Sequence, residues 1–223
     1  MENVLDLKWN KLLSRAGLFS FVPFVEIVFV AGSMAMETAG ENSDFDVIVG
    51  VKTGRIFTAR AFCIFMFGVF GWRKRRSETG TRAKDKFCFS HFVTPEKYGL
   101  SGPYNIYWEK LYSSLVPVYG EKEKIQKFYD ANGIWMKNKK IYTKDVRHLY
   151  LKPGYIKIFL EKILGGKLGN ILEVWLKNIQ VEKIEKSLKT EKQYKPRIIF
   201  NNQELEFHPD TRRIEEMLNR KEF

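Results

Sequence analysis

The sequence predicts an α+β fold: a small mixed β-sheet core flanked by helices and followed by a mainly helical C-terminal lobe with a short terminal hairpin. Apolar, β-branched segments alternate with helix-compatible ones up to residue 95. Beyond it, apolar residues recur at helical spacing, and two short strand-like segments flank Asn201-Asn202. We therefore expect two parts, a core at residues 1–95 and a mainly helical C-terminal lobe at 96–223.

The first part is expected to alternate helices and strands. Leu5, Trp9, Leu12 and Leu13 recur at helical spacing and predict an amphipathic first helix. The strands are predicted from runs of β-branched and aromatic residues. In order, the expected elements are a helix at 5–17, a strand at 25–31, a short helix at 34–37, a strand at 45–51, a helix at 55–71 and a strand at 86–93.

The second part is expected to be mainly helical. A glycine pair, Gly165-Gly166, interrupts its longest helical segment and predicts two helices there instead of one. The expected elements are helices at 104–116 and 121–131, two helices within 155–190, a hairpin of 197–200 with 204–207, and a helix from Ile214 with Asp210 as its N-cap.

Two short motifs carry the functional prediction. Gly32-Ser33 follows the first expected strand, and ten residues later Asp44 and Asp46 alternate with apolar residues at the start of the next strand. Residues two apart on a strand point the same way, so the two carboxylates are expected on one face. Carboxylates placed side by side repel each other, and Mg²⁺ prefers such hard oxygen ligands and bridges them to phosphates.

Gly32 and Ser33 suit the same chemistry. Glycine permits a sharp turn and a close approach to a ligand. Because a helix is expected directly after the pair, Ser33 would lie at a helix N-terminus, where free N–H groups favour phosphate. A phosphate cradle beside metal-binding carboxylates predicts phosphoryl or nucleotidyl transfer.

These residues resemble the DNA polymerase beta-like nucleotidyltransferase superfamily, and in particular its small bacterial and archaeal members. The matching motif is Ala31-Gly32-Ser33, ten residues, then Asp44-Phe45-Asp46-Val47. The resemblance covers roughly residues 25–50. It implies a small mixed-sheet core, in which Gly32 and Ser33 bind the nucleotide phosphates and Asp44 and Asp46 bind Mg²⁺ or Mn²⁺.

The superfamily normally has a third carboxylate on a later strand, and the expected strand at 86–93 contains no acid. Asp85, just before it, is one candidate, although the alternative is a solvated loop residue between two lysines. His91 within the strand is either a catalytic base or a structural histidine.

The resemblance therefore implies a metal-dependent enzyme that transfers a nucleoside monophosphate from an NTP to an acceptor hydroxyl on RNA, a small molecule or a partner protein. An alternative is a nucleotide- or RNA-binding module on the same fold that has lost catalysis. A third interpretation, an antitoxin that acts on a partner toxin, is compatible with both. The fold does not choose among acceptors.

The net charge of +12 is unevenly distributed. Residues 1–53 carry four basic and seven acidic side chains, whereas the remainder carries thirty-four basic and nineteen acidic ones. An acidic metal site in a basic body suits a polyanionic partner, so RNA or another polyanion is expected besides the NTP. The densest basic cluster, residues 73–76, opens an expected loop that either clamps phosphates or remains solvated.

Compartment is predicted from the cysteines and from the apolar segments. Cys63 and Cys88 lie in apolar runs without metal-ligand spacing and are expected to be free thiols in a reducing cytoplasm. The N-terminus has no secretory signal pattern. The apolar stretches at 18–31 and 56–72 are short and contain charged residues, so no transmembrane segment is expected.

Overall fold

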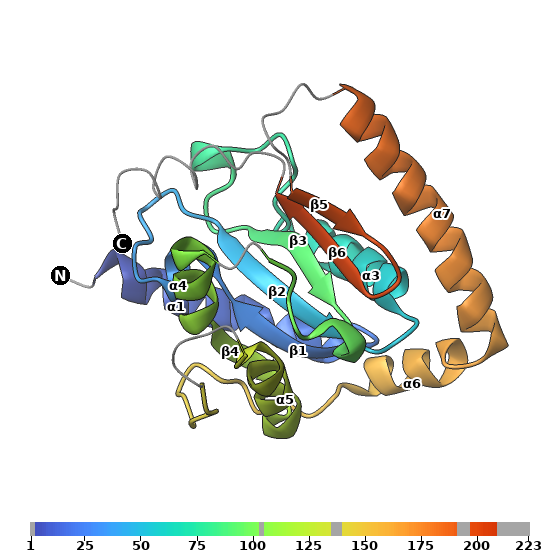
Figure 1. Cartoon of the computed structure of the whole chain (residues 1–223), viewed down its shortest axis with the longest axis horizontal. Coiled ribbons are helices and arrows are strands. Elements are labelled where there is room, and N and C mark those ends of the chain that lie inside the picture. Colours follow the sequence, from blue (N-terminus) through green and yellow to red (C-terminus); the bar gives the residue numbers. More distant parts are fainter. Residues whose placement is uncertain (1–2, 103–104, 135–139, 191–196, 209–223) are drawn as a thin grey trace.

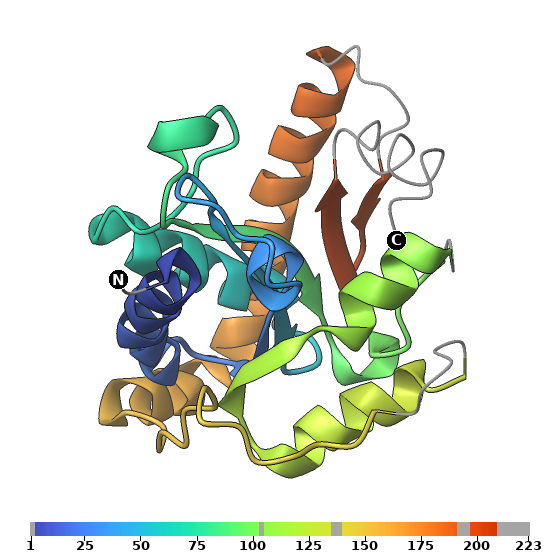
Figure 2. The ribbon, with the colours of Figure 1, turned by 90° about the vertical axis from the view of Figure 1, so that its left-hand side faces the viewer.

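A mixed six-stranded β-sheet with helices on both faces forms the fold (Figures 1 and 2). The computed structural model describes residues 3–102, 105–134, 140–190 and 197–208. The strand order is β4-β1-β2-β3-β6-β5; only β2 and β3 pair in parallel, and the other pairs are antiparallel. The strands are β1 (Val25–Val30), β2 (Phe45–Val51), β3 (Phe87–Val93), β4 (Val116–Gly120), β5 (Arg197–Phe200) and β6 (Glu204–His208). The predicted α+β class is confirmed.

Seven α-helices and three 3₁₀ segments accompany the strands in the described ranges. The helices are α1 (Val4–Ala16), α2 (Gly32–Ala35), α3 (Ile56–Val69), α4 (Ile106–Ser113), α5 (Lys122–Asn132), α6 (Tyr155–Leu164) and α7 (Lys167–Thr190). The 3₁₀ segments are Gly17–Phe21, Gly80–Arg82 and Pro95–Lys97. None of the described helices is long and apolar enough to cross a membrane.

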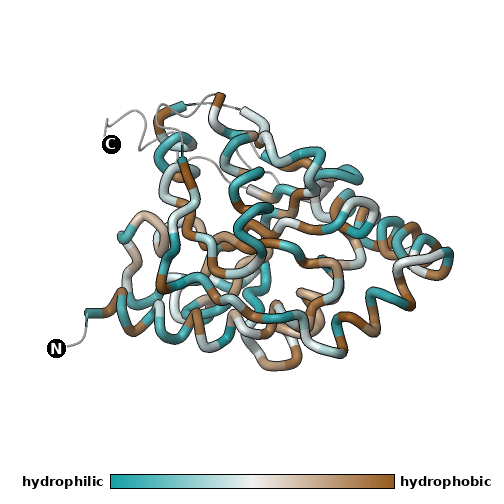
Figure 3. The backbone as a smooth tube through the Cα atoms, turned by 90° about the horizontal axis from the view of Figure 1, so that it is seen from below, coloured by the Kyte–Doolittle hydropathy of each residue, from teal (hydrophilic) through white to brown (hydrophobic). Residues whose placement is uncertain are grey.

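The sheet separates two hydrophobic clusters. Ile27 and Phe29 of β1 face one cluster, which is completed by α4 and α5, whereas Val28 and Val30 face the other, which includes α1 and α3. Because both faces of β1 are buried, every residue of the strand except Glu26 is apolar, and the sequence does not alternate. Hydrophobic and hydrophilic residues alternate along the helical segments (Figure 3), as expected of helices that bury one side.

Most elements begin and end close to the predicted positions, but β4 was not predicted. The expected helix at 104–116 ends at Ser113, because Pro117 disfavours helical backbone in the residue before it. The β-branched and aromatic residues around Pro117 then form β4, an edge strand that pairs with β1. The predicted helix from Ile214 lies outside the described residues.

The sheet contains strands from both predicted parts of the chain. β4 pairs with β1, and β6 pairs with β3, so residues after 95 supply both neighbours of the first three strands. The division of the chain into two parts at residue 95 stays a prediction. The sheet itself is continuous, because strands from both parts are hydrogen-bonded to each other.

The long helix α7 is fixed to the first turn of α3. The Glu173 carboxylate accepts hydrogen bonds from the backbone N–H groups of Phe57 and Thr58 at 2.9 and 2.8 Å. A carboxylate is favourable at a helix N-terminus, where N–H groups lack partners within the helix. The break between α6 and α7 falls at Gly165-Gly166, as predicted.

Candidate functional site

The two sequence motifs meet where β1 ends and β2 begins. The strands are antiparallel neighbours, and the backbone N–H of Ala31 donates to the carbonyl of Asp46 at 2.9 Å. Gly32 has a φ of +61°, and a Cβ at this position would lie 2.3 Å from Oδ2 of Asp46. Glycine is therefore required here both for its left-handed backbone and for its close contact with the carboxylate.

Asp44, Asp46 and Cys88 form a cluster of three possible metal ligands. One carboxylate oxygen from each aspartate and the Cys88 sulfur lie within 4.8 Å of one another. Cys88 is the register partner of Asp46 across the parallel pair of β2 and β3. Burial, followed by the charge of Asp46, raises the pKa of the Cys88 thiol far above its ordinary value, so the sulfur is a neutral thiol beside two hard oxygen ligands.

Lys74 brings the basic segment 73–76 into this site. Its Nζ lies 2.6 Å from Oδ2 of Asp44, and its backbone N–H donates to the carbonyl of Phe87 at 2.9 Å. Burial lowers the pKa of Lys74, but the groups beside it, among them the Asp44 and Asp46 carboxylates, raise it above its ordinary value. The ammonium group therefore stays charged and offsets the negative charge of the carboxylates.

Ser33 follows Gly32 within the one-turn helix α2 and is partly exposed. Its carbonyl accepts a hydrogen bond from Thr38 at 2.9 Å, which closes the turn after the motif. The helix is as short as predicted but begins at Gly32 instead of Met34, so Ser33 lies within its single turn.

Asp85, the weak candidate for a third carboxylate, is directed toward α1. Its two oxygens bind Lys8 and Lys11 at 2.8 and 2.5 Å, and Arg15 donates to its carbonyl. Among the described residues, Asp85 does not belong to the cluster around Asp44 and Asp46. It is not a solvated loop residue, because its side chain is buried against α1, while its backbone N–H donates to the Ser43 carbonyl at 3.2 Å.

A cavity of about 260 Å³ opens beside the cluster. Asp46 and Lys74 line it together with several aromatic side chains. The aromatic residues are Tyr107, Trp108 and Tyr112 of α4 and Phe207 of β6. Charged groups and aromatic rings that line one cavity suit a ligand with phosphates and a planar ring.

A second polar cluster adjoins this cavity, and its His91 is one of the lining residues. His91 of β3 and Glu204 and Glu206 of β6 are all buried, with ligand atoms within 4.8 Å of one another. The guanidinium of Arg197 donates to Glu206 at 2.8 Å, and the Ser101 hydroxyl donates to Glu204 at 3.3 Å. Sequence reasoning missed both glutamates, although they repeat the acid-apolar-acid pattern of Asp44 to Asp46.

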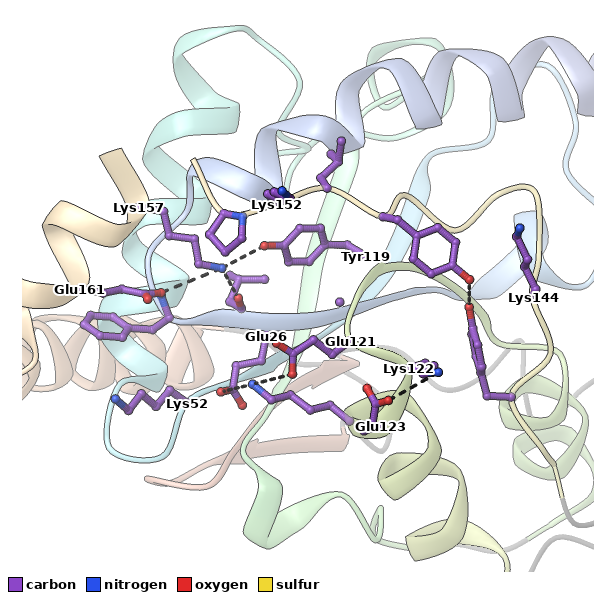
Figure 4. Close-up of a pocket in the computed structure, with 18 residues that line it drawn as sticks. Glu26, Lys52, Tyr119, Glu121, Lys122, Glu123, Lys144, Lys152, Lys157 and Glu161 are labelled. Atoms are coloured by element: carbon purple, nitrogen blue, oxygen red, sulfur yellow. Dashed lines mark hydrogen bonds and ion pairs between the residues drawn. The ribbon is translucent and has the colours of Figure 1, made fainter. Parts of the chain in front are cut away.

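Figure 4 shows a larger cavity, about 1040 Å³, at the opposite end of β1, where Val25 begins the strand. The Nζ of Lys157 donates there to the Tyr119 hydroxyl at 3.0 Å, and Lys124 pairs with Glu26 at 2.9 Å. Six lysines and four glutamates line it, and Gly32, Asp44 and Asp46 do not. Its size exceeds that of the first cavity, but the chemistry predicted from the sequence lies elsewhere.

Comparisons with protein-family models, curated proteins and solved structures found no match to this chain. What the structure offers toward a function is the chemistry of the candidate site. That site combines two carboxylates, a lysine, a glycine turn and an aromatic-lined cavity.

Proposed function

We propose that this protein is a nucleotidyltransferase that moves a nucleoside monophosphate from an NTP to an acceptor hydroxyl. The observation that carries the proposal is the position of the Asp44 and Asp46 carboxylates against the Gly32 turn, with Lys74 beside them. The resemblance of Ala31 to Val47 to the DNA polymerase beta-like superfamily points to the same chemistry.

Asp44 and Asp46 would hold Mg²⁺ or Mn²⁺, which supplies charge stabilisation for the transferring phosphoryl group. Their oxygens suit a hard cation, whereas the neutral Cys88 thiol does not compete for one. Gly32 and Ser33 would bind the β- and γ-phosphates. Lys74 neutralises Asp44 in the metal-free protein and is close enough to contact phosphates when a nucleotide binds.

The aromatic residues of the smaller cavity would bind the nucleobase by stacking, which tolerates any base because every base has a π-face. RNA or another polyanion is the proposed acceptor class, since thirty-four of the thirty-eight basic residues follow residue 53.

A second candidate is a binding module that retains the nucleotide but does not transfer it. The observation that favours it is Cys88, because a thiol and not a third carboxylate stands beside Asp46. Both candidates predict nucleotide binding at Asp44 and Asp46, and they differ in catalysis.

The test uses each α-labelled NTP with Mg²⁺, with and without total RNA and cell lysate. We expect wild-type protein to transfer label and the Asp44→Ala, Asp46→Ala double variant to transfer none. Nucleotide binding without transfer under any condition would favour the binding module.

A further inference from the structure

We propose that His91, held by Glu204, is the general base of the transfer reaction and takes the role for which no third carboxylate is present in β3. The inference rests on the proposed function and names the group that would accept the proton from the acceptor hydroxyl.

A bulge in β3 directs His91 into the site. The register of β2 with β3 runs from Asp46 opposite Cys88 to Ile48 opposite His91, so β3 uses three residues where β2 uses two. In a regular strand, Cys88 and His91 would point to opposite faces, because side chains alternate. With the extra residue, both line the cavity that also contains Asp46 and Lys74. Bulges of this kind re-aim side chains beside active sites.

Glu204 gives His91 a defined orientation. Nε2 of His91 lies 3.3 Å from Oε1 of Glu204, and the two residues are 3% and 0% exposed. The Ser101 hydroxyl holds the second oxygen of Glu204 at 3.3 Å. When Nε2–H donates to the carboxylate, Nδ1 is the basic nitrogen. Within the described part of the chain, no partner of Nδ1 is found.

Charged side chains surround the imidazole of His91. Arg197 offsets Glu206, so the charge of Glu204 remains to stabilise an imidazolium. This is the logic by which a carboxylate supports a histidine base. The charged or titratable groups that face His91 or share its cavity are Glu204 and Glu206 of β6, Arg197 of β5, Tyr107 and Tyr112 of α4, Cys88 of β3, Asp46 of β2 and Lys74.

The proposed step transfers one proton, forms one bond to phosphorus and breaks another. The acceptor O–H gives its proton to Nδ1 of His91, and the acceptor oxygen forms a bond to the α-phosphorus of the NTP. The bond between the α-phosphorus and the bridging oxygen breaks, and pyrophosphate leaves with the electron pair. The imidazolium then returns the proton to water.

The experiment compares wild type with His91→Gln, His91→Ala and Glu204→Gln, using α-labelled NTP, Mg²⁺ and total RNA over a range of pH. Glutamine retains a donor toward Glu204 but has no basic nitrogen, so it tests basicity with little loss of packing. His148→Gln is the matched control, because His148 bonds the Gly120 carbonyl beside the larger cavity. Nucleotide binding and thermal unfolding are measured for every variant.

We expect both His91 variants to bind nucleotide like wild type and to lose about 10²–10⁴-fold in kcat. The acid limb of the wild-type pH profile should disappear, and added imidazole should restore part of the activity of His91→Ala. Glu204→Gln should lower kcat with little change in KM for the NTP.

Wild-type kcat in a folded His91→Gln variant, or an unchanged acid limb, would overturn the assignment of the base while leaving the proposed transfer intact. Absence of transfer by the wild-type protein would instead overturn the transfer itself, and the base with it.

Discussion

Gly32 is the residue on which the geometry of the candidate site depends most. Alanine at this position would retain a φ of +61° and place a Cβ 2.3 Å from Oδ2 of Asp46. We expect Gly32→Ala to lose about 1–2 kcal/mol in free energy of unfolding from the left-handed backbone, and to lose metal binding because Asp46 must move.

Gly54→Ala is the matched control for this variant. Gly54 has a φ of +72°, but a Cβ there meets no atom within 4 Å. It should therefore be destabilised to a similar degree and still bind Mn²⁺ in a titration followed by electron paramagnetic resonance. Equal Mn²⁺ affinity of the two variants would contradict the role given to Gly32.

Asp85 makes a prediction about stability and pH. Burial raises the pKa of its carboxyl, but hydrogen bonds from Lys11 and Lys8 lower it by more, so the folded-state pKa lies below its ordinary value of about 3.9. The stabilisation is therefore present above about pH 4 and is lost as the pH falls through the folded pKa.

Asp85→Asn should cost about 3–5 kcal/mol at neutral pH, because it leaves the buried Lys8 ammonium without its carboxylate. Denaturant unfolding from pH 3 to 7 checks this, and the difference from wild type should shrink at the acid end. Glu41→Gln, which removes an exposed partner of Lys84, should change little. A constant difference across the pH range would exclude this account of Asp85.

At the scale of elements, the segment between α3 and β3 enters the site through Lys74. Lys74→Met should strengthen Mn²⁺ binding, because Asp44 loses its competing ammonium at 2.6 Å. The same change should weaken NTP binding about ten- to a hundred-fold, since a hydrogen bond to a charged group is worth about 1.5–3 kcal/mol. Isothermal titration measures both affinities.

Lys86→Met provides the control for Lys74, because Lys86 pairs with Glu78 and not with the cluster. It should leave metal and nucleotide affinity near wild type. If Lys74→Met instead weakened the binding of both Mn²⁺ and NTP, Lys74 would only support the fold.

The strands also show which elements can be predicted from local sequence patterns and which cannot. β2 was predicted with its observed bounds, Phe45–Val51, because four of its seven residues are valine or isoleucine, which are apolar and β-branched. β4 was missed because a five-residue strand interrupted by Pro117 has no alternation to detect. Short edge strands are formed by pairing, here with β1, and not by local propensity.

For the candidate site, the sequence identified the residues that share a motif but not those that the fold brings in from afar. Asp44 and Asp46 could be paired from their spacing alone. Cys88 and His91 are placed on one face by a bulge, and no residue pattern in β3 predicts this bulge. Glu204 reaches His91 only because β6 pairs with β3, a contact across more than a hundred residues.

At the scale of the whole molecule, we infer from the order of the strands in the sheet that residues 1–95 do not fold alone. That fragment lacks β4 beside β1 and β6 beside β3, and it lacks α4 and α5, which cover Ile27, Phe29 and Ile48. We expect it to aggregate or remain unfolded by circular dichroism and gel filtration, whereas a 1–208 fragment should unfold cooperatively. A cooperative transition in the 1–95 fragment would support an independent domain ending at residue 95.

The central claim is that a nucleotide and its metal bind where Gly32 meets Asp46. The most direct measurement is a crystal structure of the full chain with Mn²⁺ and a non-hydrolysable NTP analogue, with anomalous scattering used to locate the metal. We expect a manganese peak between the Asp44 and Asp46 carboxylates and the triphosphate beside Gly32 and Ser33. A nucleotide in the larger cavity near Lys157, with no metal at Asp44 and Asp46, would contradict it.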